Sequence, residues 1–303
     1  MPTTPKGWAI HLTKLVCAVQ HAHRLPRFPI DVEAIARDYS RQVFPNAPVT
    51  MVEGLNLSKG IEGMLMPNPQ GTGEWGIIYN QTIKSKGRRN FTLAHELGHY
   101  LLHRHAHPVG LQCTNRNMAD WSAGRNVIEA EANTFASYLL MPLDDFRAQI
   151  KGRIIDIDVM TELADRYAVS LTAAILKWLT ITDKRAMIVV GKEGFNDWAW
   201  SCEPLIKSGI YCAARQSVIE LPSASLAALE VDMDTGRYGR RHPAGVWLGS
   251  EPVHEMTVFS PSNEMTISLL LYPDRAPSRW EMAQLDEEPT LDAFDKFMDG
   301  QAG

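Results

Sequence analysis

The chain has 303 residues, 45% of them hydrophobic, so it can bury a core without disulfide bonds, and this excludes disorder for most of its length. Lys and Arg number 30 against 35 Asp and Glu, and the net charge of −5 argues against sequence-independent nucleic-acid binding, which needs clustered basic side chains. Four cysteines without short paired spacing indicate reduced thiols, so we expect a cytoplasmic protein. The first residues lack the apolar core of a secretory signal, and no apolar run approaches the ~20 residues of a membrane span.

The first part of the chain has mainly helical periodicity. Helices are expected over 7–23, 31–39, 89–103, 126–142 and 156–179, with Asp31 suited to cap the second of these. Two β-like runs at 60–66 and 74–80, joined by turn-forming residues, predict a hairpin or two edge strands. The segment 104–125 reads as irregular.

A helix-turn-helix outline lies inside the last of these helical blocks, over residues 163–179. It breaks near Ala168 and Val169, and its second helix starts at Ser170. A DNA-reading helix would start with basic or amide side chains, whereas the residues that follow Ser170 are small or apolar. We therefore favour a structural or substrate-docking helix pair over a DNA reader.

The character of the sequence changes after Thr182. Short strand-like runs are expected at 186–190, 209–214, 244–249, 253–259 and 264–272. Trp198 and Trp200 lie on a further strand, where core packing is favoured over an aromatic binding platform. The end of the chain from Glu281 is acidic and is expected to hold a short helix near 291–298. The sequence thus predicts an α+β fold with two domains: residues 1–182, helical with a small β-sheet and including the helix-turn-helix-like segment at 156–180, and residues 183–303, mainly β with an acidic tail.

Five of the ten histidines fall within thirteen positions, and two of them form a motif with known chemistry. His95, Glu96 and His99 match the pattern H-E-x-x-H within an uninterrupted amphipathic helix. Two histidines four residues apart lie on one helix face, so both imidazoles can reach one Zn²⁺. Glu96 beside them can then act as the general base that activates water. The bland alternative, a solvated surface turn rich in His and Glu, is disfavoured by the amphipathic helix around the motif.

A catalytic zinc needs a third protein ligand, and the next predicted helix offers two acidic candidates, Glu129 and Glu131. Asn133 lies one turn beyond Glu129 on the same face, where its amide could hydrogen-bond a ligand imidazole or Glu129 itself. This pairing favours Glu129. Two histidines and one glutamate form a ligand set typical of metallopeptidases, whereas structural zinc usually has four ligands rich in Cys.

The remaining histidines and the nearest cysteine fit the site less well. His103 lies eight residues from His95, about 12 Å along a helix, which is too far to share one ion. We therefore interpret His103 as a residue that supports a ligand or ends the helix, and His105 and His107 as solvated. Cys113 could be a fourth, inhibitory ligand, although a plain thiol is favoured from sequence.

Several segments together resemble the ImmA/IrrE family of bacterial and phage metallopeptidases, which have a compact zincin fold. The resemblance rests on FTLAHELGHYLLH (91–103) and EAEANTFASYLLMP (129–142), and extends to PIDVEAIARDY (29–39) and LADRYAVSLTAAILKWL (163–179). It implies zinc ligands at His95, His99 and Glu129 and a catalytic base at Glu96. The residues after 183 match no family feature, although in some relatives an added C-terminal domain is thought to sense a signal.

Members of that family cleave helix-turn-helix repressors or trigger their cleavage, which controls mobile elements or stress genes. The sequence therefore predicts a zinc-dependent endopeptidase that hydrolyses a partner protein, with a helix-turn-helix transcriptional repressor as the expected substrate. The alternatives are a non-proteolytic regulator that binds DNA or a repressor, and a protease of broad specificity. Specific DNA binding by the metal-stripped protein in a gel shift would favour the regulator, and activity on unfolded casein-like substrates would support the protease of broad specificity.

Overall fold

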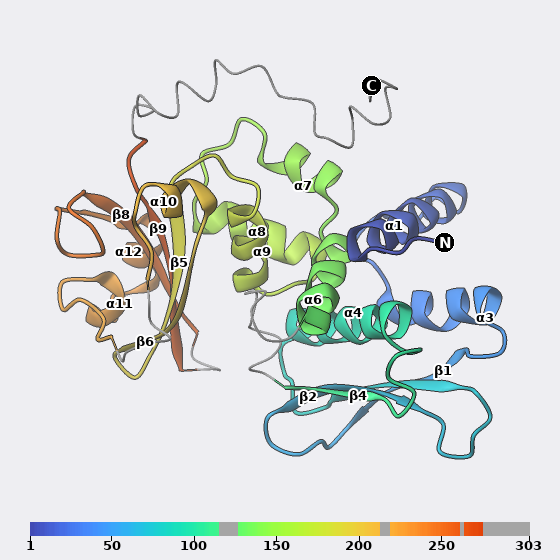
Figure 1. Cartoon of the computed structure of the whole chain (residues 1–303). Coiled ribbons are helices and arrows are strands. Elements are labelled where there is room, and N and C mark those ends of the chain that lie inside the picture. The colour runs from blue at the N-terminus through green and yellow to red at the C-terminus, as the bar shows by residue number, and fades with distance from the viewer. Residues whose placement is uncertain (115–126, 213–218, 261–263, 275–303) are drawn as a thin grey trace, which may run out of the picture.

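The computed structural model describes residues 1–114, 127–212, 219–260 and 264–274, and it contains two β-sheets with helices between and around them (Figure 1). The smaller sheet belongs to the first part of the chain and the larger one to the last part. This arrangement confirms the predicted α+β class.

Four strands form the smaller sheet: β1 (Val49–Leu55), β2 (Ile61–Pro67), β3 (Trp75–Asn80) and β4 (Leu111–Thr114). Their order is β1-β3-β2-β4, with β1 parallel to β3 and the other neighbours antiparallel. The predicted hairpin is the β2–β3 pair. The sequence did not predict β1 or β4, because both pair with strands distant in the chain.

The helices of this part follow the predicted order with shifted ends. They are α1 (Pro5–Ala22), α2 (Val32–Ala34), the π-helical turn η1 (Ile35–Tyr39), α3 (Ser40–Val43), α4 (Lys86–Leu102), α6 (Val127–Leu140), α7 (Leu143–Ile150), α8 (Ile157–Tyr167) and α9 (Leu171–Leu179). Asp31 caps α2 as expected, since its carboxylate accepts a hydrogen bond from the Ala34 N–H. Helix α7, which lies between the helices expected at 126–142 and 156–179, was not predicted.

Helices α4 and α6 pack directly against each other, and a glycine makes this possible. A Cβ on Gly98 would lie 2.9 Å from a ring carbon of Phe135 and 3.2 Å from the Cα of Ala132. The two backbones can approach this closely only because position 98 has no side chain. The approach brings the first turn of α6 over the histidine face of α4.

Helices α8 and α9 form the predicted helix-turn-helix outline, with Ala168 in the left-handed conformation at the turn and Ser170 capping α9. Every residue of α9 from Ala173 to Leu179 is buried. A recognition helix must expose side chains to the DNA groove. Because α9 is covered by protein, it cannot read DNA without unpacking, which supports the structural interpretation of this pair.

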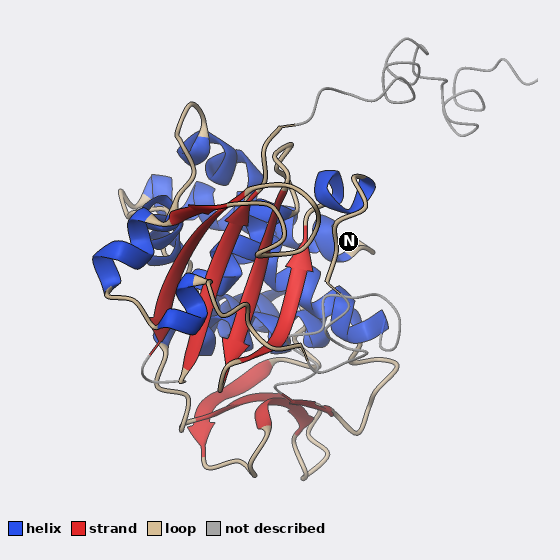
Figure 2. Ribbon diagram, turned by 90° about the vertical axis from the view of Figure 1, so that its left-hand side faces the viewer, coloured by secondary structure: helices blue, strands red, loops and turns tan. Residues whose placement is uncertain are grey.

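Five strands form the larger sheet, which Figure 2 shows from the front with helices behind it. They are β5 (Ala186–Lys192), β6 (Phe195–Ser201), β7 (Arg240–His242), β8 (Val253–Ser260) and β9 (Met265–Leu271), in the antiparallel order β6-β5-β9-β8-β7. Three short helices accompany it: α10 (Glu203–Lys207), α11 (Leu226–Leu229) and α12 (Met233–Tyr238). Trp198 and Trp200 lie on β6, half-buried against the core.

Two predicted strands of this region are wrong. Residues 244–249 form turns and bends, and Trp247 packs into the hydrophobic core from this loop while its indole N–H donates to Glu255. Residues 209–212 continue from a turn after α10, while 213 and 214 lie outside the described residues. Short apolar runs can be buried by loops as well as by strands, and periodicity cannot distinguish these cases.

The hydrophobic core continues from the helices into the larger sheet, and α9 packs against β5. The predicted boundary near 183 therefore coincides with a change of architecture and not with a gap in the core. None of the described helices combines the length and apolarity that crossing a bilayer requires. The acidic tail from Glu281 and the expected helix near 291–298 lie outside the described residues.

Candidate metal centre

Helix α4 carries the three residues of the H-E-x-x-H motif. Its N-terminus is capped by Ser85, whose hydroxyl accepts the Arg88 N–H, and helical spacing then places His95 and His99 one above the other. His95, Glu96 and His99 are all fully buried, between α6 on one side and the smaller sheet on the other. Buried polar side chains of this kind need partners that satisfy them.

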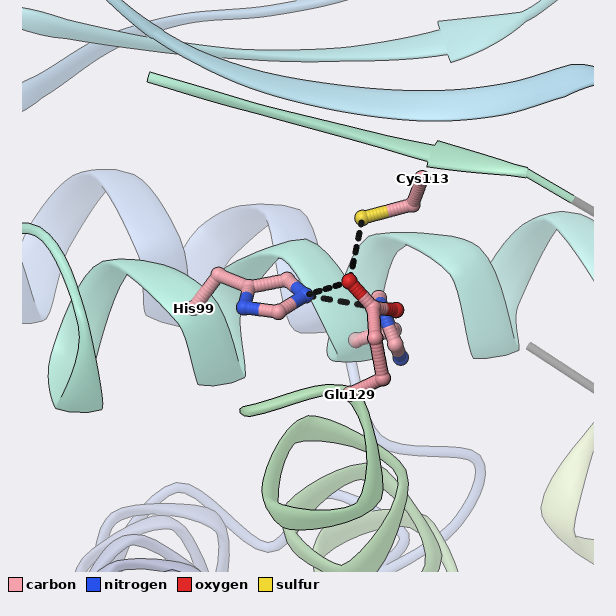
Figure 3. A group of neighbouring side chains, drawn as sticks. His99, Cys113 and Glu129 are labelled. Atoms are coloured by element: carbon pink, nitrogen blue, oxygen red, sulfur yellow. Dashed lines mark hydrogen bonds and ion pairs between the residues drawn. The ribbon is translucent and has the colours of Figure 1, made fainter. Parts of the chain in front are cut away.

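Two further side chains reach the histidines from other elements, as Figure 3 shows. Glu129, in the first turn of α6, places Oε2 3.2 Å from His95 Nε2 and Oε1 3.5 Å from His99 Nε2. Cys113 approaches from β4, with its Sγ 4.0 Å from Glu129 Oε1. The ligand atoms of these four residues lie within 4.8 Å of one another, so the group could hold a metal ion.

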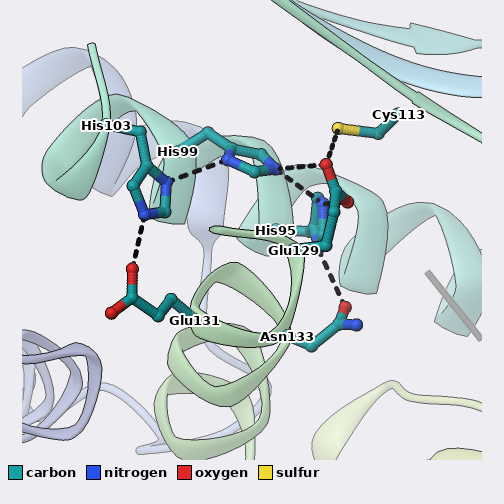
Figure 4. A network of polar contacts seen from close by, with 7 residues as sticks. All are labelled: His95, His99, His103, Cys113, Glu129, Glu131 and Asn133. Carbon is teal, nitrogen blue, oxygen red and sulfur yellow. Dashed lines mark hydrogen bonds and ion pairs between the residues drawn. The ribbon is translucent and has the colours of Figure 1, made fainter. Parts of the chain in front are cut away.

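The outward-facing nitrogens of both histidines are held by a chain of polar contacts (Figure 4). His95 Nδ1 lies 2.9 Å from Asn133 Oδ1. His99 Nδ1 lies 3.0 Å from His103 Nδ1, and His103 Nε2 lies 2.8 Å from Glu131 Oε2. Contacts of this kind fix the ring orientation and tautomer of metal-ligating histidines.

The hydrogen-bond acceptors in this row of contacts determine which ring nitrogen of each histidine carries the proton. Asn133 Oδ1 accepts, so His95 carries its proton on Nδ1 and its Nε2 is a bare lone pair. The Glu131 carboxylate takes the Nε2–H of His103, so His103 Nδ1 accepts the Nδ1–H of His99. Both Nε2 atoms then present lone pairs.

These two Nε2 atoms lie only 2.9 Å apart and face the Glu129 carboxylate. Lone pairs that converge on a carboxylate repel one another unless a cation lies between them. Glu129 Oε2 also makes no hydrogen bond within the described part of the chain. The donor set therefore fits a divalent metal ion.

The charge states of Glu129 and His99 agree with this fit. Burial opposes ionisation of Glu129, but its interactions with His95 and His99 outweigh burial and hold the pKa of Glu129 well below its usual range. Burial lowers the pKa of His99 to about 4. Near neutral pH the site thus offers a carboxylate and a neutral imidazole, which are the forms that bind metal. Burial lowers the pKa of His95, but its interactions with Glu129 and Glu96 outweigh burial and raise that pKa above its usual value, so metal binding would displace a proton from this ring.

Glu96 differs from Glu129 in having no short hydrogen bond to its carboxylate, although the Cys113 thiol faces it. Both of its carboxylate oxygens are buried and accept no hydrogen bond from the described residues. Burial raises the pKa of Glu96 to about 7. Gly63 on β2 leaves room for this carboxylate, because a Cβ there would collide with Glu96 and with Thr92. A buried acid with this pKa and free oxygens can accept and return a proton near neutral pH.

The structure places the other candidates as follows. Glu131, the rejected ligand candidate, contacts His103 and not His95 or His99. His103 caps the end of α4 and contacts His99, whereas His105 is exposed and His107 is half-buried. Sequence reasoning missed Gly63 and the contact between His103 and Glu131, because both depend on packing between elements distant in the chain.

Comparison with known families identifies part of the chain. A family model described as the IrrE N-terminal-like domain, of peptidase family M78, matches residues 61–179. That segment runs from the start of β2 to the end of α9 and contains all four clustered residues. No curated protein matches the chain significantly. Residues 61–179 are therefore an IrrE-like metallopeptidase domain with a buried group of potential metal ligands.

Proposed function

We propose that the chain is a zinc endopeptidase in which His95, His99 and Glu129 hold the metal and Glu96 is the general base. The observation that carries this proposal is the pairing, in one buried site, of three converging ligand atoms with a glutamate whose oxygens are unsatisfied among the described residues. Two histidines and a carboxylate are the ligand set of catalytic zinc. When bound, zinc supplies a Lewis acid that polarises the scissile carbonyl and lowers the pKa of water.

The protein side chains have two further roles: they orient the two histidines and they transfer the proton. Asn133 and the His103–Glu131 pair keep both Nε2 atoms aimed at the ion. Glu96 takes a proton from the attacking water on one carboxylate oxygen and passes it to the amide nitrogen that leaves. Burial makes Glu96 basic enough to perform both transfers near neutral pH.

The substrate we propose is a helix-turn-helix transcriptional repressor, whose cleavage would release mobile-element or stress genes. Two things support a protein substrate of this class: the IrrE-like domain and the resemblance of the sequence to ImmA/IrrE peptidases. Direct DNA binding is disfavoured, because α9 is buried along most of its length.

Substitution of Glu96 by Gln tests the mechanism. It should lower the cleavage rate by about 10²–10⁴-fold, because proton transfer is lost, while zinc binding is retained. Rates would be measured by gel or mass spectrometry on two substrates, unfolded casein and any helix-turn-helix repressor that is found in a gene neighbouring that of this protein. Glu53→Gln, an exposed change on β1, is the control and should leave the rate unchanged.

The outcomes separate the parts of the proposal. If Glu96→Gln cleaves as fast as the unmodified protein, the mechanism is wrong. If casein is cut in a Glu96-dependent manner and the repressor is not, the endopeptidase stands and the substrate class is wrong.

A further inference from the structure

Cys113 is a buried thiol that belongs to the hydrophobic core, but its Sγ lies among groups that can bind a metal. Its Sγ lies 4.0 Å from Glu129 Oε1 and, with the Nε2 atoms of His95 and His99, completes a compact set of four potential ligands (Figure 4). The carboxylates of Glu96 and Glu129 both face it. Cys113 thus points into the site described above.

A second buried cysteine shows what a structural thiol looks like in this chain. Cys202 Sγ accepts the Ala186 N–H at 3.1 Å and contacts the Lys184 carbonyl oxygen at 3.0 Å. Both of its partners are backbone groups, so the thiol is satisfied locally. Cys113, in contrast, donates to the carboxylate of Glu129, a proposed metal ligand.

The distances suit one ion. Zinc bonds of about 2.0–2.1 Å to nitrogen or oxygen and about 2.3 Å to sulfur place tetrahedral ligand atoms roughly 3.5 Å apart. The four ligand atoms lie within 4.8 Å of one another without an ion, so small side-chain shifts bring them into a tetrahedral shell. No change of fold is needed.

The position of Cys113 in the sheet also provides a way to withdraw it. β4 is a four-residue edge strand that pairs with β2, where Cys113 is opposite Gly63. An edge strand is held by hydrogen bonds along one side. A shift of β4 alone could therefore remove the sulfur and leave the ligands on α4 and α6 in place.

We propose that Cys113 is a fourth protein ligand that holds the metal site closed, so that the domain is latent until β4 moves. This inference rests on the proposed function, because it concerns the same metal. On ligation the thiol releases its proton to solvent and the sulfur binds as thiolate, without change of oxidation state. Four protein ligands fill the tetrahedral shell and exclude a substrate carbonyl.

Cobalt is the probe that tests ligation, because Co²⁺ gives a thiolate charge-transfer band in the near ultraviolet that is separate from its visible d–d bands. The full chain loaded with Co²⁺ should show both features. Cys113→Ser should lose the charge-transfer band and keep the d–d bands. Cys202→Ser is the matched control, because serine can keep both backbone contacts at that equally buried position, and it should keep the band.

A second measurement uses the unmodified protein, so its result does not depend on whether the cysteine variants fold. Zinc should slow alkylation of Cys113 by iodoacetamide, followed by peptide mass spectrometry, about tenfold more than it slows alkylation of Cys202. Equal slowing of both cysteines would mean that zinc stabilises the fold without touching Cys113, and the inference would be overturned.

Latency is tested by activity on whichever substrate the unmodified protein cleaves. Zinc-loaded Cys113→Ala should cleave faster, and a gain of about tenfold corresponds to about one tenth of the unmodified molecules being open at rest. A rate at or below that of the unmodified protein, in a variant that keeps its d–d bands, overturns latency.

The failures are distinguishable. Visible d–d bands without a charge-transfer band in the unmodified protein would reject Cys113 as a ligand and leave the proposed zinc peptidase intact. Absence of any cobalt or zinc binding would reject the metal site itself, and both proposals with it.

Discussion

Each of the two sheets borders a buried glutamate next to a histidine, yet the two carboxylates have opposite hydrogen-bond environments. Glu255 on β8 is fully buried beside His242, whose Nε2 lies 2.8 Å from its Oε2. Both of its oxygens are satisfied by donors from several elements: the Leu226 and Ala227 N–H groups that open α11, the Trp247 indole and the Thr257 hydroxyl. Glu96 is equally buried, and neither of its oxygens is satisfied by a described residue.

Burial and residue type alone therefore do not separate a structural carboxylate from one that awaits a ligand. The hydrogen-bond environment does, because a buried carboxylate without donors costs folding energy that only a function or a bound group explains. Glu255 ties α11 and the turn at Trp247 to the larger sheet. Glu129 belongs to a group of potential metal ligands, and Glu96 lies beside that group.

The largest expected effect is on stability, in the larger sheet. Glu255→Gln places an amide NH₂ against N–H donors, and we expect it to lower the free energy of unfolding by about 3–5 kcal/mol. Urea denaturation measures this. Glu220→Gln, an exposed change in the same region, should shift the free energy by less than about 0.5 kcal/mol. If Glu255→Gln were as stable as the unmodified protein, the hydrogen bonds of Glu255 would not stabilise the fold, and the proposed difference between Glu255 and Glu96 would be wrong.

The next effect concerns the metal site. At a free zinc concentration 100 times the dissociation constant, binding should stabilise the folded chain by about 2.7 kcal/mol, and a chelator should remove this gain. Thermal denaturation with and without zinc measures it. Glu255→Gln should show the same zinc-dependent gain, since Glu255 has no part in the site. If zinc no longer stabilised Glu255→Gln but still stabilised His95→Ala, the metal would bind near Glu255 and not at the proposed site.

The smallest effect is on the residues that orient the ligands. Asn133→Ala should weaken zinc binding by about 10–100-fold, because His95 loses the partner that fixes its tautomer. Competition with a chromophoric chelator gives the affinity. Asn90→Ala is the control, because Asn90 also lies on α4 but contacts the Ala168 carbonyl. Equal affinities for both variants would show that the Asn133 contact does not orient the ligand.

Local patterns in the sequence account for part of this arrangement. The helix around His95, the helix that carries Glu129 and the hairpin of β2 and β3 all follow from periodicity and turn residues within a short stretch of chain. The strand expected at 244–249 failed because these residues form turns and bends, from which Trp247 packs into the hydrophobic core and donates to Glu255 eight residues away. Strand β4 was missed because its four residues are too few to show a pattern and its partner β2 is distant in the chain.

The sequence by itself determined that His95, Glu96 and His99 share one helix turn, since helical spacing is set by backbone hydrogen bonds within the segment. Only the tertiary structure decided how Glu129 faces both imidazoles, that Glu131 contacts His103, and that the Cys113 thiol points into the same space. These contacts depend on how closely α6 and β4 pack against α4. That closeness arises from small residues such as Gly98, whose effect appears only when two distant segments meet.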